Sequence, residues 1–175
     1  MLSQYNPIIL ERALSAADPA PHFPPIEDRP AWQGVADDLG HDTVAKLIDK
    51  AEEAADAPIP PLPATLYLEV KRTGQREGYE QPMALRRAML TDLCIGESLE
   101  NQGRFRDAIL DVAWAICEES SWAYPAHQFE LTDIHRPYID LGAAMTALDL
   151  AELDALVGRA LDPALRKRIY DELDR

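Results

Sequence analysis

Apolar residues recur three and four positions apart through most of this 175-residue chain, and this spacing limits the folds that the chain can adopt. The clearest example is the segment 104–119. Its apolar positions are Phe105, Ala108, Ile109, Val112, Ala113, Ile116 and Cys117. Side chains at this spacing lie on one face of an α-helix, whereas a half-buried strand alternates in steps of two. The segment is therefore predicted to form an amphipathic helix.

The same spacing predicts helices elsewhere in the chain. They are expected at residues 7–17, 42–57, 82–101, 138–158 and 162–175. Residues 64–73 alternate like a strand, but no second strand is predicted to pair with them, so we expect a helix there too. Asp162 followed by Pro163 is typical of a helix start. We therefore predict an all-α fold made of antiparallel helix pairs.

Two of these helices are expected to bury different amounts of their surface. For residues 82–101, the predicted buried positions are Leu85, Met89, Leu93, Gly96 and Leu99. Residues 138–158 are apolar nearly all round. This composition is typical of a helix enclosed within a two-layer helical array.

Two proline-rich segments are expected to be connectors without regular structure. Residues 18–30 contain five prolines, and residues 58–63 read PIPPLP. Proline fixes its own φ angle and lacks a backbone donor, so the first segment favours an extended strap across the surface. Trp32 is predicted to hold this strap against the body. The length fits a single domain over residues 1–175.

The charge of the chain argues against two classes of partner. Its net charge is -14, and its longest basic run is only Arg166, Lys167 and Arg168. Such a surface repels phosphate backbones, so nucleic acid is not expected to bind. The N-terminus does not resemble a signal peptide, and no apolar stretch is long enough to span a bilayer. We expect a cytoplasmic protein, or a secreted one if a leader has been removed, with no membrane partner.

The two cysteines are expected to be packing residues. Cys94 and Cys117 both fall within apolar helical patterns. Two thiols in a chain of this length do not form a disulfide framework, and a buried free thiol behaves as a small hydrophobe. His127, Asp133 and His135 have no spacing typical of a tight metal site. We predict neither a metal nor another cofactor.

The connector between the helices 104–119 and 138–158 is the main candidate for function. Long connectors in compact domains are often functional. Four residues of this connector are candidates for substrate binding: Trp122, Tyr124, His127 and Arg136. Aromatic faces stack on sugar rings, and imidazole and guanidinium groups bind hydroxyls and carboxylates. The composition therefore fits the wall of a carbohydrate-binding cleft.

Each candidate also has a structural interpretation. Trp122 is equally well explained as a core residue, and His127 as a structural histidine. Arg136 is also explained by pairing with surface carboxylates. Glu118 and Glu119 are interpreted first as a charge cluster at a helix end, because adjacent helical side chains point about 100° apart and do not face one substrate. Catalytic residues are not identified within the chain.

Residues 118–175 resemble the toroid domain of the heparinase II/III-like polysaccharide lyases. The features that carry the resemblance are Trp122 with Pro125-Ala126-His127, then Tyr138-Ile139-Asp140-Leu141, an alanine-rich helix, and Leu161-Asp162-Pro163. Residues 22–32, HFPPIEDRPAW, look like the segment that precedes the first toroid helix in that family.

The resemblance implies that the chain is the N-terminal part of an (α/α) toroid. Such proteins carry a β-sandwich after the toroid and cleave uronate-containing glycans by β-elimination. A tyrosine or histidine moves the proton, and an asparagine or histidine neutralises the carboxylate. These residues are expected on helices beyond Arg175, so this chain alone is expected to lack them. A cleft-lining role transfers only to Trp122, Tyr124 and His127.

We therefore predict a toroid segment of a polysaccharide lyase-like protein, with an acidic polysaccharide or oligosaccharide as its partner. Two alternatives remain open. One is an acidic helical interaction domain, and the other is a segment of an (α/α)-toroid glycoside hydrolase. An incomplete toroid exposes apolar helix faces, so self-association is also expected.

Overall fold

The computed structural model describes residues 6, 8–9, 11–12, 23–128 and 130–174, which form helices and turns without a β-strand. The elements are α2 (Arg29–Leu39), α3 (His41–Asp56), α4 (Ala64–Tyr67), α5 (Glu69–Thr73), α6 (Glu77–Glu100), α7 (Arg106–Cys117), α8 (Pro125–Gln128), α9 (Leu141–Val157), the 3-10 turn η2 (Gly158–Ala160) and α10 (Pro163–Leu173). The all-α prediction is confirmed. The helix expected at 7–17 lies largely outside the described residues, as does the first part of the strap.

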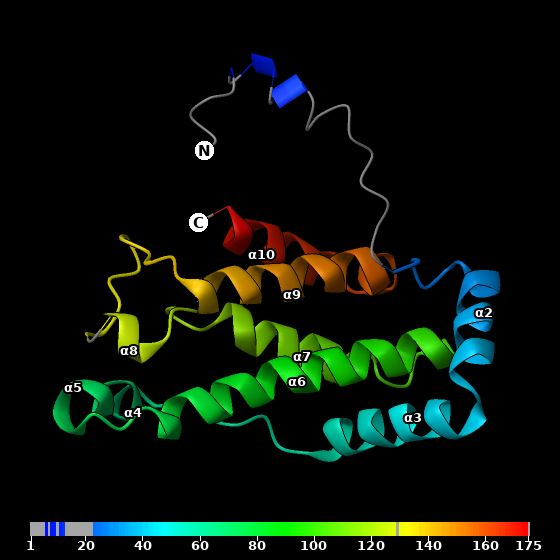
Figure 1. The fold of residues 1–175 in the computed structure, drawn as a ribbon, viewed down its shortest axis with the longest axis horizontal. Helices are drawn as coiled ribbons and strands as arrows, with labels where there is room; N and C mark the ends of the chain where they lie inside the picture. The colour runs from blue at the N-terminus through cyan, green and yellow to red at the C-terminus, as the bar shows by residue number, and fades with distance from the viewer. Residues whose placement is uncertain (1–5, 7, 10, 13–22, 129, 175) are drawn as a thin grey trace.

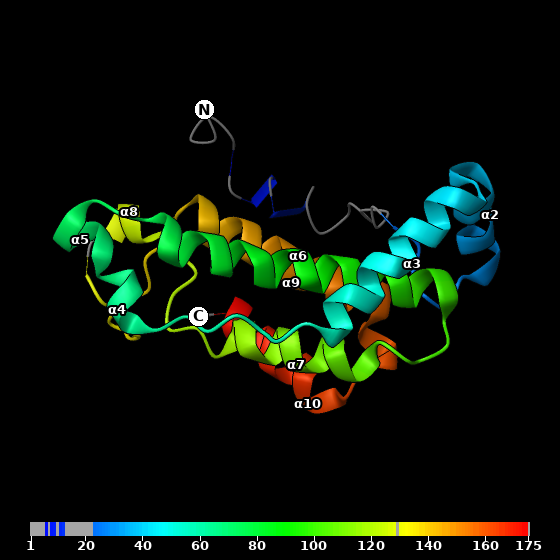
Figure 2. The ribbon, with the colours of Figure 1, turned by 90° about the horizontal axis from the view of Figure 1, so that it is seen from below.

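Two antiparallel hairpins form the body of the molecule. One consists of α6 and α7, and the other of α9 and α10 (Figure 1). Helices α6 and α9 lie side by side in one layer, with α3 along the other flank of α6, while α7 and α10 form a second layer (Figure 2). The antiparallel pairs are thus confirmed, and closure into a toroid stays a prediction.

The core lies between these two layers. Its most deeply buried side chains come from the turn before α7 and from α6, α7, α9 and α10. They are Leu93, Phe105, Ile109, Ile116, Leu150, Leu153, Leu165 and Ile169. Cys94 and Cys117 are also buried and unpaired, as predicted for packing residues. Burial raises the pKa of the Cys117 thiol to about 11, so this thiol is neutral at physiological pH.

The strap is held by Trp32, as its sequence suggested. Trp32 is buried, and its indole Nε1 donates to the carbonyl oxygens of Pro24 at 3.1 Å and Pro25 at 3.2 Å. The helix α2 that contains Trp32 was not predicted, because the prolines before it were taken to continue the connector. Asp28 caps this helix by accepting a hydrogen bond from Ala31 N–H. Proline at the second position then suits a first helical turn.

The predicted orientation of α6 was wrong at one position. Leu85 is 52% exposed, whereas the next residue, Arg86, is 9% exposed. The buried side of α6 therefore differs from the purely apolar stripe, because Arg86 faces an ionic partner, Glu119, which follows the end of α7. The helix also begins at Glu77 and not at Pro82. Pro82 lies inside the helix, where it removes only its own backbone hydrogen bond, and α6 continues through it.

The prediction that the apolar helix 138–158 is enclosed was also wrong. Its regular part, α9, buries one side, which includes Leu150, Leu153 and Val157. The opposite side remains exposed, and Leu141 and Met145 on it are 66% and 52% exposed. The reason is that α9 lies at the edge of its layer, where none of the described helices covers its outer side (Figure 1).

None of the described helices is both long and apolar enough to cross a membrane.

Gly96 allows helix α6 to approach helix α3 closely. A Cβ atom at this position would overlap Ala51 Cβ in α3 and lie 3.1 Å from the Phe105 ring. We expect Gly96→Ala to lower the free energy of unfolding by about 1–3 kcal/mol through overpacking. Gly34→Ala is the control, since no atom lies within 4 Å of its added Cβ. It should raise stability by about 0.5–1 kcal/mol. Urea unfolding followed by circular dichroism measures both, and equal effects would contradict the close approach.

Candidate functional site

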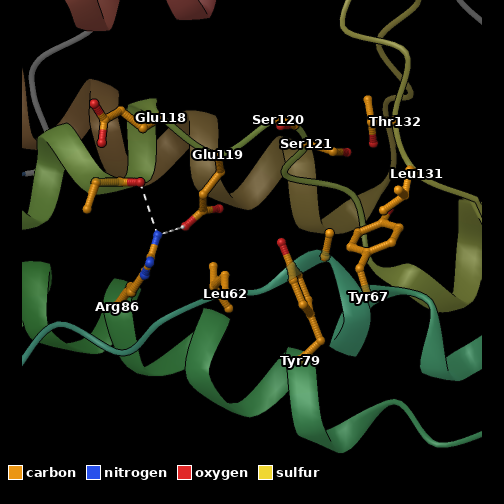
Figure 3. A pocket seen from close by; sticks show the side chains of 12 residues that line it. Leu62, Tyr67, Tyr79, Arg86, Glu118, Glu119, Ser120, Ser121, Leu131 and Thr132 are labelled. Carbon is orange, nitrogen blue, oxygen red and sulfur yellow. Dashed lines mark hydrogen bonds and ion pairs between the residues drawn. The ribbon is translucent and has the colours of Figure 1, made fainter.

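A polar cavity of about 250 Å³ lies at one end of the two hairpins. It forms where α4 and the first half of α6 meet the residues that follow α7 (Figure 3). Its main polar lining residues are Tyr67, Tyr79, Arg86, Glu119, Ser121 and Thr132. The cavity therefore combines hydroxyl groups with one ion pair, which suits a small and highly polar ligand.

Glu119 is the central charge of this cavity. Its side chain is 3% exposed and is bound by two consecutive arginines of α6. Arg86 Nη1 donates to Glu119 Oε1 at 3.1 Å. Arg87 binds both carboxylate oxygens, with Nη1 at 2.7 Å and Nη2 at 2.6 Å. The bidentate contact fixes the carboxylate and ties the end of α7 to α6.

The two arginines are themselves held by further contacts. Arg86 Nε donates to Pro60 O at 2.8 Å, and its Nη1 also donates to Ala115 O at 3.0 Å. Arg87 Nε donates to Thr146 Oγ1 of α9 at 3.2 Å. Among the described residues, none accepts a hydrogen bond from Arg86 Nη2. Glu119 therefore has two cationic partners, within a chain of net charge -14.

A cluster of hydroxyl groups lines the opposite wall of the cavity. The side-chain oxygen of Gln128 accepts hydrogen bonds from Tyr67 OH at 3.0 Å and from Thr132 Oγ1 at 3.0 Å. Ser121 Oγ lies 3.4 Å from the same oxygen. Figure 3 shows Tyr79 pointing from α6 toward Glu119, beside the Tyr67 ring. The Tyr67 and Tyr79 rings meet edge to face, with centroids 4.9 Å apart.

Both phenols of the cavity are neutral hydrogen-bonding groups. Burial raises the pKa of Tyr79, and the Glu119 carboxylate raises it further. Burial also raises the pKa of Tyr67. A general base works best with a pKa near the operating pH. These tyrosines therefore suit ligand binding and not proton abstraction.

The four candidates predicted from the connector occupy different places. Trp122 is 8% exposed, and its indole Nε1 donates to Ile116 O at 2.9 Å, so it packs in the core. Tyr124 is half-buried, and its ring meets the His127 ring edge to face. Arg136 is exposed in the loop before α9. None of the four lines the polar cavity. Their role in binding substrate stays a prediction.

His127 is bound to the residue that caps α9. Its Nδ1 lies 2.5 Å from Asp140 Oδ2, which also accepts the Tyr124 N–H at 3.0 Å. Asp140 Oδ1 accepts the Ala143 N–H at 2.9 Å, which confirms that this carboxylate stabilises the helix start. Burial raises the pKa of Asp140, but these hydrogen bonds outweigh it and lower the pKa below its usual value. The pair thus anchors the connector to α9.

The residues that build the cavity were missed by sequence reasoning. The sequence predicts Glu119 only as part of a helix-end charge cluster, and no prediction concerns Arg86. A buried partner 33 positions away leaves no local pattern in the sequence. One signal was available, since Arg86 and Arg87 interrupt the apolar side of α6 next to Met83 and Met89. Charged residues are rarely buried unless they are paired.

A search of the structure for metal ligands and a comparison of the sequence with known proteins give two further results. In the part of the chain that the structure describes, no group of three His, Cys, Asp or Glu side chains could hold a metal ion. No protein-family model matches the sequence, and a search of curated proteins finds no significant match.

The buried ion pair should dominate the stability of this end of the molecule. We expect Glu119→Gln to lower the free energy of unfolding by about 3–5 kcal/mol, because both arginines lose their countercharge. Glu118→Gln is a matched control at the next position. Glu118 is exposed and accepts only from Trp114 Nε1, at 2.9 Å, so its change should cost at most about 0.5 kcal/mol. Chemical denaturation at neutral pH checks this, and similar losses for both variants would refute it.

The Asp140 carboxylate should make stability depend on pH. Its lowered pKa means that it stabilises the fold above the pKa of about 3.9 in the unfolded chain, and this contribution is lost as pH falls through the folded value. Asp140→Asn keeps a good cap but turns an amide donor toward the Tyr124 and His127 donors. We expect a loss of about 1–3 kcal/mol at pH 7 that shrinks toward pH 3.

Asp162→Asn is the control for this pH experiment, because Asp162 caps α10 through Ala164 N–H and is exposed. It should change the free energy of unfolding by at most about 0.5 kcal/mol. Unfolding curves collected between these pH values test the expectation. A loss at Asp140 that does not vary with pH would show that the charge is not responsible.

Proposed function

We propose that this chain is a glycan-binding segment of a polysaccharide lyase-like protein, and that its polar cavity receives a uronate unit of an acidic glycan. The observation that carries the proposal is the lining of the cavity. It places the Arg86–Glu119 pair opposite the hydroxyl groups of Tyr67, Tyr79, Ser121 and Thr132. Sugar hydroxyls exchange hydrogen bonds with such groups, and a guanidinium group binds a carboxylate.

One cationic side chain of the lining can meet an acidic ligand. Arg86 lines the cavity together with the carboxylates of Glu118 and Glu119, and its contact with Glu119 holds it in place. A uronate carboxylate would bind the guanidinium group of Arg86. The volume of about 250 Å³ is below the roughly 300–1,000 Å³ typical of sites for drug-sized ligands. A single sugar ring within a longer glycan is therefore the best-fitting ligand.

The proposed role is binding, and no step of β-elimination is assigned to the residues of this cavity. The two phenols have raised pKa values, which favours donation of a hydrogen bond over removal of a proton. The alternative of a glycoside hydrolase has less support. It requires two carboxyl groups facing each other across a substrate. Glu118 and Glu119 are the carboxylates at the cavity, and Glu119 is already held by two arginines.

Binding of defined tetrasaccharides tests the proposal. Glucuronate-, galacturonate- and mannuronate-containing tetrasaccharides should be titrated against the chain, with the carboxyl-reduced form of each as its control. We expect dissociation constants on the order of 1 mM for at least one acidic form. Tyr79→Phe should weaken that binding about threefold to tenfold, because one hydrogen bond is lost while the ring contact with Tyr67 is kept.

Tyr170→Phe provides the matched control for the tyrosine variant. Tyr170 lies on α10 outside the cavity, where its hydroxyl donates to Asp154 at 2.7 Å. This change should leave the affinity for the tetrasaccharide unaltered. Equal binding of the acidic and carboxyl-reduced forms would refute recognition of a uronate. Equal affinities for the Tyr79 and Tyr170 variants would show that the glycan binds elsewhere.

A further inference from the structure

The connector between α3 and α4 has a backbone conformation that its sequence fixes. Residues 57–63 read APIPPLP, and each of them is either a proline or directly precedes one. Proline holds its own φ at about −65° and disfavours the α region for the residue before it. Both ends have polyproline II geometry, with φ −78° and ψ 142° at Ala57 and φ −70° and ψ 140° at Pro63. The connector therefore has this extended conformation before any partner binds.

The connector turns one edge toward the protein and two edges outward. A polyproline II helix has about three residues per turn, so side chains three positions apart share an edge. Ile59 packs against the main apolar core, and Leu62 packs against the smaller cluster beside the polar cavity. Figure 2 shows the connector on the outer side of the molecule, running from α3 to α4. Its outward edges form a proline ridge of exposed or half-buried residues, which are Ala57, Pro58, Pro60 and Pro61.

Hydrogen bonds to the body hold this proline ridge in place. Pro60 O accepts a hydrogen bond from Arg86 Nε at 2.8 Å, and Ala57 N–H donates to Glu53 O at 3.1 Å. None of the described residues donates a hydrogen bond to the carbonyl oxygen of Pro58 or of Pro61. The ridge therefore offers exposed proline rings and backbone acceptors in a fixed arrangement. A partner that binds it loses little affinity to ordering of the chain.

The order of residues in the proline ridge indicates what surface fits it. Two pairs with proline in second place, Ala57-Pro58 and Pro60-Pro61, are separated by Ile59, whose side chain packs against the core. Domains that recognise polyproline II segments bind them in grooves lined by aromatic side chains. Tryptophan and tyrosine rings pack on proline, and their N–H and O–H groups can donate to the carbonyl oxygens. The two pairs can thus enter such a groove while Ile59 remains in the body.

The charge beside the proline ridge indicates the rim of the groove. Asp56 directly precedes the ridge and is exposed, and it forms no ion pair with any of the described residues. Residues 51–70 contain no lysine or arginine. A groove with an acidic rim would be repelled here, whereas a basic rim would complement Asp56.

We propose that the proline ridge is a docking surface for a partner domain that has an aromatic-lined groove with a basic rim. Contact with the proline rings supplies the affinity, and the charge at Asp56 selects among such domains. This inference does not rest on the glycan site. The ridge occupies the outward edges of the connector, whereas Leu62 of the inner edge lines the polar cavity.

Titration with recombinant SH3 and WW domains, some with basic and some with acidic rims, tests the proposal. Each domain is titrated against the whole chain and against a synthetic peptide of residues 55–65. We expect a domain with a basic rim to bind the whole chain at least as tightly as the peptide, because the fold already holds the ridge in its bound conformation. Binding of the peptide but not of the chain would overturn the proposal, as would binding of neither. Tighter binding by the domains with acidic rims would overturn the basic rim.

Proline variants of the whole chain locate the contact. Pro58→Ala and Pro61→Ala should each weaken binding at least about fivefold, because each removes a ring from the groove. Pro163→Ala is the matched control, since Pro163 is an exposed proline in the first turn of α10, and it should change the affinity less than about twofold. Circular dichroism checks that the variants keep their helices. Equal affinities for the three variants would place the contact elsewhere and overturn the proposal.

Discussion

The contact between Glu119 and the arginines Arg86 and Arg87 organises the end of the molecule where the cavity lies. Breaking a buried ion pair costs far more than breaking one at the surface, because the remaining charge has no water to solvate it. Here the same three residues also reach the connector before α4 through Pro60 O, and α9 through Thr146 Oγ1. One ionic cluster therefore fixes the relative positions of α6, α7, α9 and that connector.

The middle of the two hairpins and the cavity end are stabilised by different kinds of interaction. The middle of the two hairpins is held by apolar packing, which needs shape but no particular charge. The cavity end needs every polar group to be paired, because an unpaired buried group costs about 1–3 kcal/mol. The hydroxyl cluster around Gln128 meets this need on one wall, and the arginines meet it on the other.

The sequence predicted the local structure well and the long-range contacts poorly. Helical spacing identified α3, α6, α7, α9 and α10, because each has an apolar side that the pattern reveals directly. The pattern missed α2, whose start is hidden by prolines, and it misplaced Leu85 because it could not show that Arg86 has a buried partner. Ser121 and Thr132 of the connector 120–137 line the polar cavity, but none of the four candidate residues predicted in that connector does. Its aromatic residue Trp122 instead fills the core, because indole needs a partner that Ile116 O supplies.

Helix α9 has one buried side and one exposed side, and this difference follows from its position in the fold and not from its composition alone. A helix that is apolar all round is usually enclosed, yet α9 lies at the edge of its layer, so only one of its sides is buried. Its inner side meets the cavity cluster through Thr146, and its first turn is capped by Asp140, which accepts the Ala143 N–H and also binds His127 of the connector. The inner side of α9 therefore helps to fix the residues that form the polar cavity. The apolar outer side is exposed instead, because no described helix packs against it.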